Sequence, residues 1–124
     1  MNFKNCPEFE RELKQLRKKW RSLPDDLDAA KKRIEDLYIS QDGEDNLAEY
    51  RNAFFNNKRA SILRLLEDGT EVVKMRLDVA VLGKNDKVRL VFIAIRRENS
   101  ILFVELYAKN EKPREDIKRI QKYL

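Results

Sequence analysis

The chain contains 124 residues, of which 40% are charged, and it carries a formal net charge of +5 and no histidine. The lack of histidine excludes a Ser-His-Asp triad, a Cys-His pair and an HExxH zinc site. Acid–base catalysis would therefore depend on Lys, Arg, Tyr, Asp or Glu. The three glycines stand apart from one another, which excludes a glycine-rich phosphate loop.

One domain is the expected organisation, because this length supports a two-layer core but not two separate ones. No apolar run approaches the ~20 residues that cross a bilayer, and the N-terminal sequence lacks the apolar segment of a signal peptide. Cys6 is the single cysteine and cannot form an internal disulfide, which suits a reducing cytoplasm. We predict a cytoplasmic protein with no membrane contact, in which Cys6 is a small buried or bystander thiol rather than a nucleophile.

Charge is distributed unevenly along the chain. Residues 1–73 contain 14 basic and 15 acidic side chains, whereas residues 74–124 contain 13 and 7. A basic half favours a polyanionic partner such as nucleic acid. The alternative is a charged surface that only maintains solubility.

Two helices are predicted near the N-terminus. The first covers residues 8–20, where apolar residues recur at helical spacing. The second begins near Pro24, which suits a first turn and is followed by acidic residues. Because the connection is short, the two helices should form an antiparallel hairpin. The two apolar stripes are Phe9, Leu13, Leu16 and Trp20, then Leu27, Ala30, Ile34 and Leu37.

The segment that follows is the hardest to interpret. We expect residues 39–59 to be an irregular or short-helix insertion, with 46–55 as the candidate helix. Phe54 and Phe55 either pack on the core or form a docking surface. Residues 60–66 are predicted to form an edge strand. The alternative for this segment is a helix that ends at Gly69.

Three apolar, β-branched runs predict an antiparallel meander, because charged, turn-like segments separate them. The runs are 72–81, 88–95 and 101–108. Alternation places Lys74 and Arg76 on one face, and Arg89 on the same face as the apolar residues Val91, Ile93 and Ile95. The same alternation would place Phe103, Glu105, Tyr107 and Lys109 together.

A final amphipathic helix is predicted from Pro113 at its first turn. The expected fold is therefore α+β. A helical hairpin would pack on a small antiparallel sheet of three to four strands, and a short helix would end the chain. The sheet would display a basic face that we expect to meet RNA.

This order of elements resembles the RelE/ParE superfamily of bacterial toxins from type II toxin–antitoxin pairs. The segment LYAKNEKPREDIKRI is the most specific, because it is similar to the Y-[SA]-K-x-[ED]-K segment and terminal helix of RelE-like and HigB-like members. The resemblance covers most of the chain except about 40–59. The segments that carry it are FERELKQLRKKW (9–20), VVKMRL (72–77), VRLVFIAI (88–95) and LYAKNEKPREDIKRI (106–120).

The resemblance implies a function. Members of the ribonuclease branch cleave mRNA without a metal, often in the ribosomal A site, when a 2′-hydroxyl attacks the adjacent phosphate. The chain is thus expected to be a toxin, an mRNA interferase that inhibits translation. Its partners would be mRNA, the ribosome and a cognate antitoxin, and it would need no cofactor and no metal.

Site residues follow from the same motifs. Lys74 and Arg76 resemble the family's K-x-[KR] strand, and Arg89 is similar to the arginine that opens the [FYV]-R-[LV]-[VI] strand and would clamp the phosphate. Lys109 resembles the basic residue after the last strand. Cations of this kind stabilise charge that develops on phosphate oxygens.

The chain departs from the family pattern in two places. Asn110 stands where active members commonly have an arginine. Glu115 or Asp116 lies near the place of a tyrosine that many members carry in or before the terminal helix. Tyr107 and Tyr123 are the substitutes for that tyrosine, and Tyr107 joins the predicted site.

Each candidate also has a structural explanation. Lys74 and Arg76 would be solvent-facing strand residues, Tyr107 a core aromatic, and Arg89 a partner of Glu105 or Asp78. Two other functions stay open as well. One is inhibition of DNA gyrase, as in ParE-like members, and the other is an inactive relative that only binds RNA or a protein partner.

Overall fold

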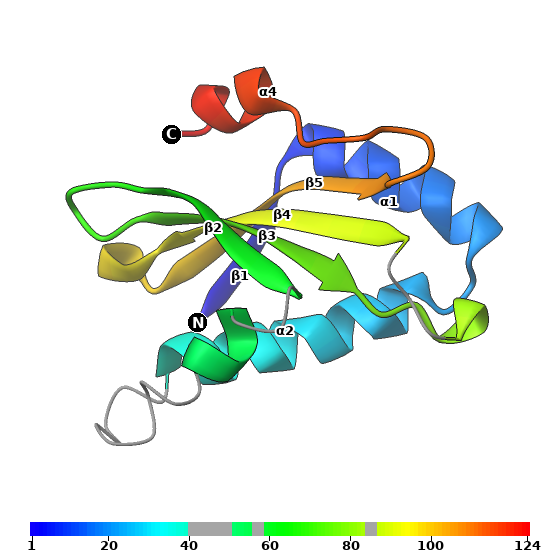
Figure 1. Cartoon of the computed structure of the whole chain (residues 1–124), viewed down its shortest axis with the longest axis horizontal. Coiled ribbons are helices and arrows are strands. Elements are labelled where there is room, and N and C mark those ends of the chain that lie inside the picture. Colours follow the sequence, from blue (N-terminus) through cyan, green and yellow to red (C-terminus); the bar gives the residue numbers. More distant parts are fainter. Residues whose placement is uncertain (40–50, 56–58, 84–86) are drawn as a thin grey trace.

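The computed structural model describes residues 1–39, 51–55, 59–83 and 87–124. Its centre is a five-stranded sheet (Figure 1). Residues 51–55 are helical. The other elements are β1 (Asn2–Asn5), α1 (Pro7–Lys19), α2 (Leu23–Ile39), β2 (Ala60–Leu65), β3 (Glu71–Leu77), η2 (Ala80–Leu82), β4 (Val88–Ile95), η3 (Arg96–Glu98), β5 (Ser100–Ala108) and α4 (Ile117–Lys122). The α+β class predicted from the sequence is confirmed.

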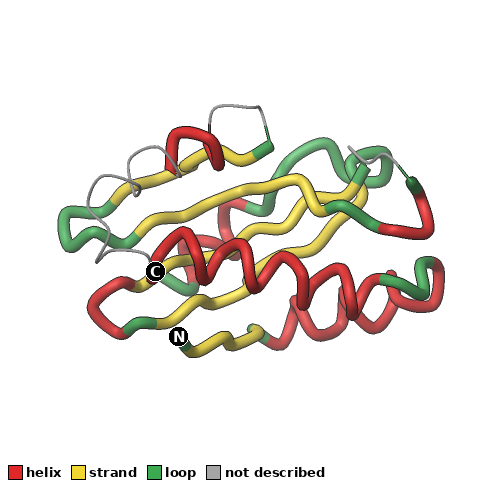
Figure 2. Tube along the Cα trace, turned by 90° about the horizontal axis from the view of Figure 1, so that it is seen from below, coloured by secondary structure: helices red, strands yellow, loops and turns green. Residues whose placement is uncertain are grey.

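The predicted helical hairpin is present. Pro7 lies in the first turn of α1, where its missing N–H costs nothing, and α1 ends at Lys19. The helices α1 and α2 lie side by side against one face of the sheet (Figure 2). Ser22, in the connection, donates a hydrogen bond to the Asp26 carboxylate at 2.7 Å. That carboxylate accepts the Ala80 N–H at 3.2 Å, which ties the hairpin to the segment after β3.

The sheet is larger and less regular than predicted. Its order is β1-β5-β4-β3-β2, and β1 pairs with β5 in parallel. The expectation of three to four antiparallel strands is therefore wrong. The sequence NFKN of β1 contains one apolar residue, Phe3, so it carries no β-branched run that would signal a strand.

The remaining strands follow the prediction more closely. β4 has the predicted bounds, and β2 is an edge strand rather than a helix. The predicted run 72–81 is too long, because β3 stops at Leu77 and a 3₁₀ turn follows. Gly83 closes that turn with a positive φ of 72°, a conformation that glycine adopts without strain.

A β-bulge changes the face of half of β5. Val91 pairs with Glu105 and Phe92 with Phe103, so Val104 is the extra residue. The predicted common face for Phe103 and Glu105 is therefore wrong. Phe103 packs in the core under the helices, whereas Val104 lies in the cluster on the opposite face.

The two faces of the sheet have cores of different size. The helix side holds the larger core, in which Phe103 stacks on Phe3 and Phe9 at centroid distances of 5.8 and 5.3 Å. Phe54 and Phe55 pack against this core, as one of the two interpretations predicted. The opposite face carries a smaller cluster whose buried members are Val72, Val91, Ile93, Val104, Tyr107 and Ile120.

The terminal helix begins later than predicted. Pro113 precedes it, and Asp116 is the N-cap, with its carboxylate accepting the Arg119 N–H at 3.1 Å. Glu105 accepts the Asp116 N–H at 2.8 Å, which fixes the start of α4 over β5. Of the helices formed by the described residues, none combines the length and apolar character needed to cross a membrane.

Candidate functional site

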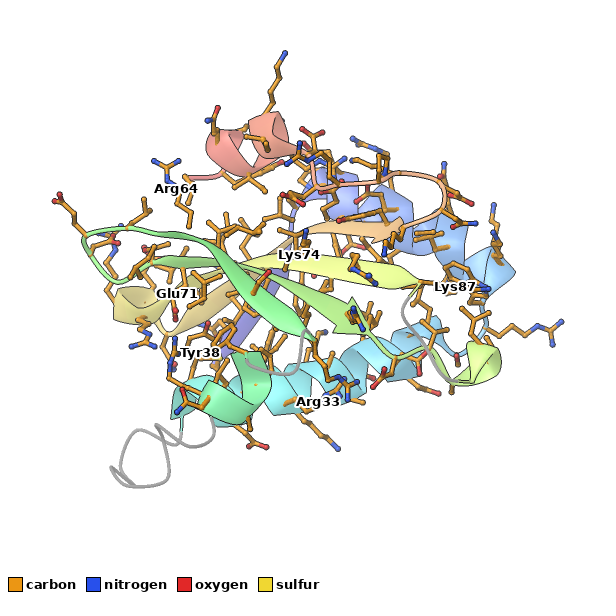
Figure 3. The ribbon with its side chains drawn as sticks, viewed as in Figure 1. Arg33, Tyr38, Arg64, Glu71, Lys74 and Lys87 are labelled. Atoms are coloured by element: carbon orange, nitrogen blue, oxygen red, sulfur yellow. The ribbon has the colours of Figure 1, made fainter. Side chains whose placement is uncertain are left out.

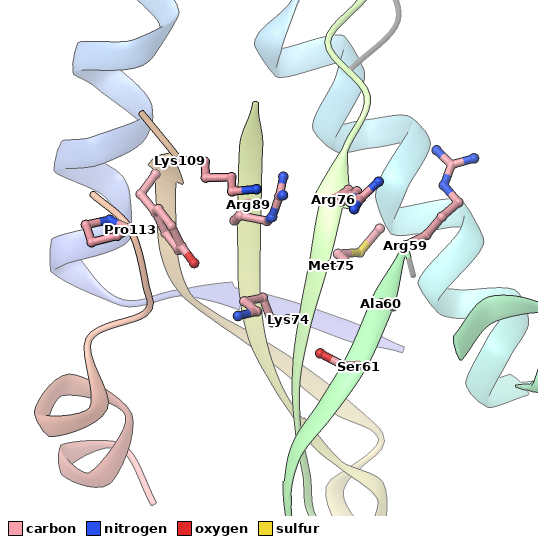
Figure 4. A pocket seen from close by; sticks show the side chains of 10 residues that line it. Arg59, Ala60, Ser61, Lys74, Met75, Arg76, Arg89, Lys109 and Pro113 are labelled. Carbon is pink, nitrogen blue, oxygen red and sulfur yellow. The ribbon is translucent and has the colours of Figure 1, made fainter. Parts of the chain in front are cut away.

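A pocket of about 330 Å³ lies on the sheet face opposite α1 and α2 (Figure 4). All five residues predicted for the site line it. Two further polar residues, Arg59 and Ser61 at the start of β2, also line it and were not predicted. The lining residues are Arg59, Ala60, Ser61, Lys74, Met75, Arg76, Arg89, Tyr107, Lys109 and Pro113.

Strand pairing brings the central residues together. Arg76 on β3 is the direct partner of Arg89 on β4, and Arg89 is in turn the partner of Tyr107 on β5. Directly paired residues point to the same face and have Cβ atoms about 4.5–5.5 Å apart. The two guanidinium-bearing residues and the phenol therefore form one row across three strands. Lys74, two residues before Arg76, lies on the same face opposite Ser61.

Backbone hydrogen bonds position the outer cations. The Arg76 N–H donates to the Arg59 carbonyl at 2.7 Å, so Arg59 lies where β2 begins, beside Arg76. The Lys109 N–H donates to the Lys87 carbonyl at 2.7 Å, which extends the β5–β4 ladder and places Lys109 beside Arg89. Figure 4 shows Lys109, Arg89 and Arg76 in a row across the strands.

The charge of this pocket is one-sided. Five of its lining side chains are cationic, and among the described residues that line it none is acidic. Arg89 is only 8% exposed, which makes it the deepest of these cations. Like charges gathered at close range repel one another. An anion bound among them would relieve that repulsion.

Lys74 has an acidic partner at the rim of the pocket. Its ammonium group lies 2.9 Å from a carboxylate oxygen of Glu115, in the loop before α4. Burial opposes ionisation of Glu115, but hydrogen bonds from its own backbone N–H and from Lys74 outweigh burial and lower its pKa. Glu115 thus stays ionised, and Lys74 is shared between this carboxylate and the pocket.

Tyr107 is a neutral phenol at physiological pH. Burial raises the pKa of its hydroxyl to about 12, with the negative charges of Glu115 and Glu105 adding to the effect and Arg89 opposing it. A phenol with this pKa can donate a hydrogen bond, but it does not act as a base near pH 7. Its predicted place in the site is therefore compatible with a donor role.

Glu105 holds the segment that follows β5 beside the pocket. Its side chain is fully buried, forms an ion pair with Lys112, and accepts the Asp116 N–H. The Lys112 ammonium also lies 5.7 Å from the centre of the Tyr107 ring. Because Glu105 is held by these groups, it serves to anchor the segment 109–116 beside the pocket.

A second group of charges surrounds the buried Glu71 at the start of β3, and Figure 3 labels Glu71 together with Tyr38. Glu71 is 2% exposed and forms ion pairs with Arg51 at 2.7 Å and Arg96 at 3.2 Å. Burial, reinforced by the charge of Glu71, raises the pKa of Tyr38. Here one carboxylate pairs with two arginines, and its ion pair with Arg51 fastens residues 51–55 to the sheet.

The remaining candidates lie outside the pocket. The Tyr123 hydroxyl donates to Glu8 on α1, so Tyr123 does not substitute for a site tyrosine. Cys6 is buried, its thiol donates to the Val104 carbonyl at 3.2 Å, and burial raises the pKa of that thiol. The described residues contain no cluster of acids or thiols that could hold a metal ion.

The two carboxylates predicted as alternative partners of Arg89 pair with other cations. Asp78 forms ion pairs with Arg33 and Arg59. Glu105 forms its ion pair with Lys112.

Comparison with protein-family models, with curated proteins and with solved structures finds no match for this chain.

Proposed function

We propose that this protein is a metal-independent endoribonuclease of the RelE/ParE kind, the toxin of a type II toxin–antitoxin pair, acting on mRNA in the cytoplasm. The observation that supports this most is the convergence of Lys74, Arg76, Arg89, Tyr107 and Lys109 on one pocket. These residues come from β3, β4, β5 and the segment after β5. They are the same five residues that the sequence predicts, four from the family's motifs and Tyr107 as a substitute tyrosine.

The chemistry requires stabilisation of one phosphodiester. The 2′-hydroxyl attacks the adjacent phosphorus, the bond from phosphorus to the 5′-oxygen breaks, and a 2′,3′-cyclic phosphate and a 5′-hydroxyl are formed. Negative charge grows on the phosphate oxygens in the transition state. Preorganised cationic donors stabilise such charge strongly because they need not reorganise during the reaction.

Each side chain has a role in this scheme. Arg76 and Arg89, adjacent partners on β3 and β4, clamp the non-bridging phosphate oxygens. Tyr107 donates a hydrogen bond from its phenol, which its raised pKa keeps neutral. The Glu115 carboxylate, which pairs with Lys74, would accept the proton of the 2′-hydroxyl, and the Lys74 ammonium would give a proton to the departing 5′-oxygen, which becomes the 5′-hydroxyl. Lys109 supplies further positive charge at the rim.

The proposed antitoxin would neutralise the same surface. A pocket lined by five cations attracts acidic segments as well as RNA. Antitoxins that fold on binding could cover the pocket with acidic side chains and so exclude mRNA.

A cleavage assay tests the proposal. Wild-type protein and the Lys74→Ala, Arg76→Ala and Arg89→Ala variants are added to a translating extract. In a parallel assay the same proteins are added to free RNA, with and without EDTA. We expect the wild type to cleave mRNA in the extract, its activity on free RNA not to depend on EDTA, and each variant to cleave far more slowly. Equal behaviour of all four proteins would show the site to be wrong. Absence of growth inhibition on expression of the wild type would remove the toxin assignment.

A binding-only function is the second candidate. It is favoured by the raised pKa of Tyr107, which keeps the phenol protonated, and by the ion pair with Lys74, which engages the Glu115 carboxylate that would otherwise act as the base. In that case the protein would bind RNA with an affinity that falls as salt rises, and the RNA would stay intact.

A further inference from the structure

A second, apolar pocket adjoins the cationic one at the start of β2. It has a volume of about 200 Å³ and shares Arg59, Ala60 and Met75 with the cationic pocket. Its other lining residues are Arg33, Ala53 and Phe54. Two of these come from the helical residues 51–55, which carry no part of the motifs that indicated the cationic site.

The composition of this second pocket suits a flat, partly polar ring. Phe54, Met75 and the two alanines provide apolar surface, and Arg33 and Arg59 provide guanidinium groups. Both guanidinium groups are tethered to Asp78, with Arg33 at 3.5 Å. Nucleobases bind to proteins by stacking on aromatic rings and on arginine planes.

The size of the pocket is also appropriate. An enclosed apolar cavity of about 150 Å³ accommodates one benzene ring. The adjoining pocket of 200 Å³ is somewhat larger and open to solvent on one side, which suits a single base and little more.

Continuity with the cationic pocket decides which ring would bind. Because Arg59, Ala60 and Met75 line both pockets, the two pockets adjoin, and a group next to a phosphate held near Arg76 can reach the second one past Arg59. In a nucleic acid strand, a base is the apolar group that accompanies every phosphate. We infer that the second pocket holds the nucleobase next to the bound phosphodiester, with Phe54 as its stacking surface. This inference rests on the proposed RNA-binding function.

The experiment uses strands that cannot be cleaved. Fluorescence anisotropy at one fixed, low salt concentration measures binding of a 2′-O-methylated RNA octamer and of an abasic phosphodiester strand of equal length. We expect the wild type to prefer the base-bearing strand. In Phe54→Ala, affinity for that strand should fall about 10-fold, as loss of one stacked base predicts, and affinity for the abasic strand should not change.

Phe55→Ala is the matched control. Phe55 is the neighbouring ring, with its centroid 5.1 Å from that of Phe54, but it lies against Arg51 and does not line the pocket. Its removal should leave the preference for bases intact. If Phe54→Ala does not fold, Phe54→Leu retains the apolar contacts without the aromatic ring and should show the same selective loss. Phe54→Tyr should behave as the wild type.

The outcomes separate this inference from the function on which it rests. If the wild type binds neither strand, both are wrong. If binding depends on Arg76 but Phe54→Ala has the wild-type affinities, the base pocket alone is wrong, and the cavity is left for an apolar side chain of a protein partner. An equal loss for both strands in Phe54→Ala would also overturn it, because Phe54 would then act only by supporting the fold.

Discussion

The two faces of one sheet show how the same strands can serve stability on one side and chemistry on the other. Alternate residues of β3 point to opposite faces, with Val73, Met75 and Leu77 under the helices and Val72, Lys74 and Arg76 facing away. The helix-covered face is buried and mostly apolar, with the ion-paired Glu71 as a buried charge at the start of β3. The opposite face has a small apolar cluster under α4 and, further along the strands, a pocket lined by five cations.

The difference follows from what covers each face. Two long helices can bury a whole face of the sheet, whereas the six-residue α4 and the segment before it cover only part of the other. The uncovered part has room for charged residues that remain near solvent. Substitutions on the two faces should therefore have separable consequences, stability on one and activity on the other.

The largest expected effect is on the helix-covered face. Phe103→Ala should lower the free energy of unfolding by about 3–5 kcal/mol, because it removes a fully buried ring that stacks on Phe3 and Phe9. Ile120→Ala, in the smaller cluster, should cost about 2 kcal/mol, since fewer neighbours surround the cavity it leaves. Chemical denaturation measures both free energies. If Ile120→Ala lost more stability than Phe103→Ala, the helix-covered face would not be the main source of stability.

Arg76→Ala should separate activity from stability. We expect RNA cleavage to fall about 100- to 1,000-fold, as for the loss of one preorganised donor. The free energy of unfolding should change by less than about 0.5 kcal/mol, because Arg76 is partly exposed and outside the apolar cores. Arg64→Ala removes an exposed arginine of the neighbouring strand that does not line the pocket. That control should keep full activity, and a comparable loss would point to general charge rather than to the pocket.

Stability at high pH should depend on Tyr107. Its pKa in the folded protein is raised to about 12 from an ordinary value of 10.0. The folded state therefore holds this proton more tightly than the unfolded state, and the associated stability is present below pH 10 and lost as pH rises towards 12. We expect about 1–2 kcal/mol less loss over that interval in Tyr107→Phe than in wild type. Denaturant titrations at about pH 9.5 and about pH 11.5 measure the difference, and equal losses for the two proteins would contradict it.

The smallest effect should come from the acidic rim. Glu115→Gln releases Lys74 from its ion pair and removes a negative charge beside the pocket. Affinity for RNA should rise about 2- to 5-fold, in line with the energy of a partly exposed ion pair. Glu111→Gln is the control, because Glu111 is exposed, pairs with Lys19 at 3.3 Å and does not line the pocket. A decrease in affinity for Glu115→Gln would instead assign Glu115 to RNA binding.

Several features of this protein could be predicted from local sequence. The stripe of α1, the bounds of β4 and the strand containing Lys74 and Arg76 follow from periodicity, which depends only on the geometry of each element. Because adjacent strands of a meander pair directly, the neighbourhood of Arg76, Arg89 and Tyr107 could be anticipated as well.

Tertiary structure decided the rest. The parallel pairing of β1 with β5 joins segments almost a hundred positions apart, and nothing local in NFKN signals it. The bulge at Val104 moves Phe103 and Glu105 to opposite faces, although strict alternation placed them together. The delayed start of α4 depends on Glu105 accepting the Asp116 N–H, and the engagement of Lys74 depends on Glu115. Sequence periodicity determined which residues share a face within an element. Long-range strand pairing and buried charges decided which elements contact one another and which residues line the pocket.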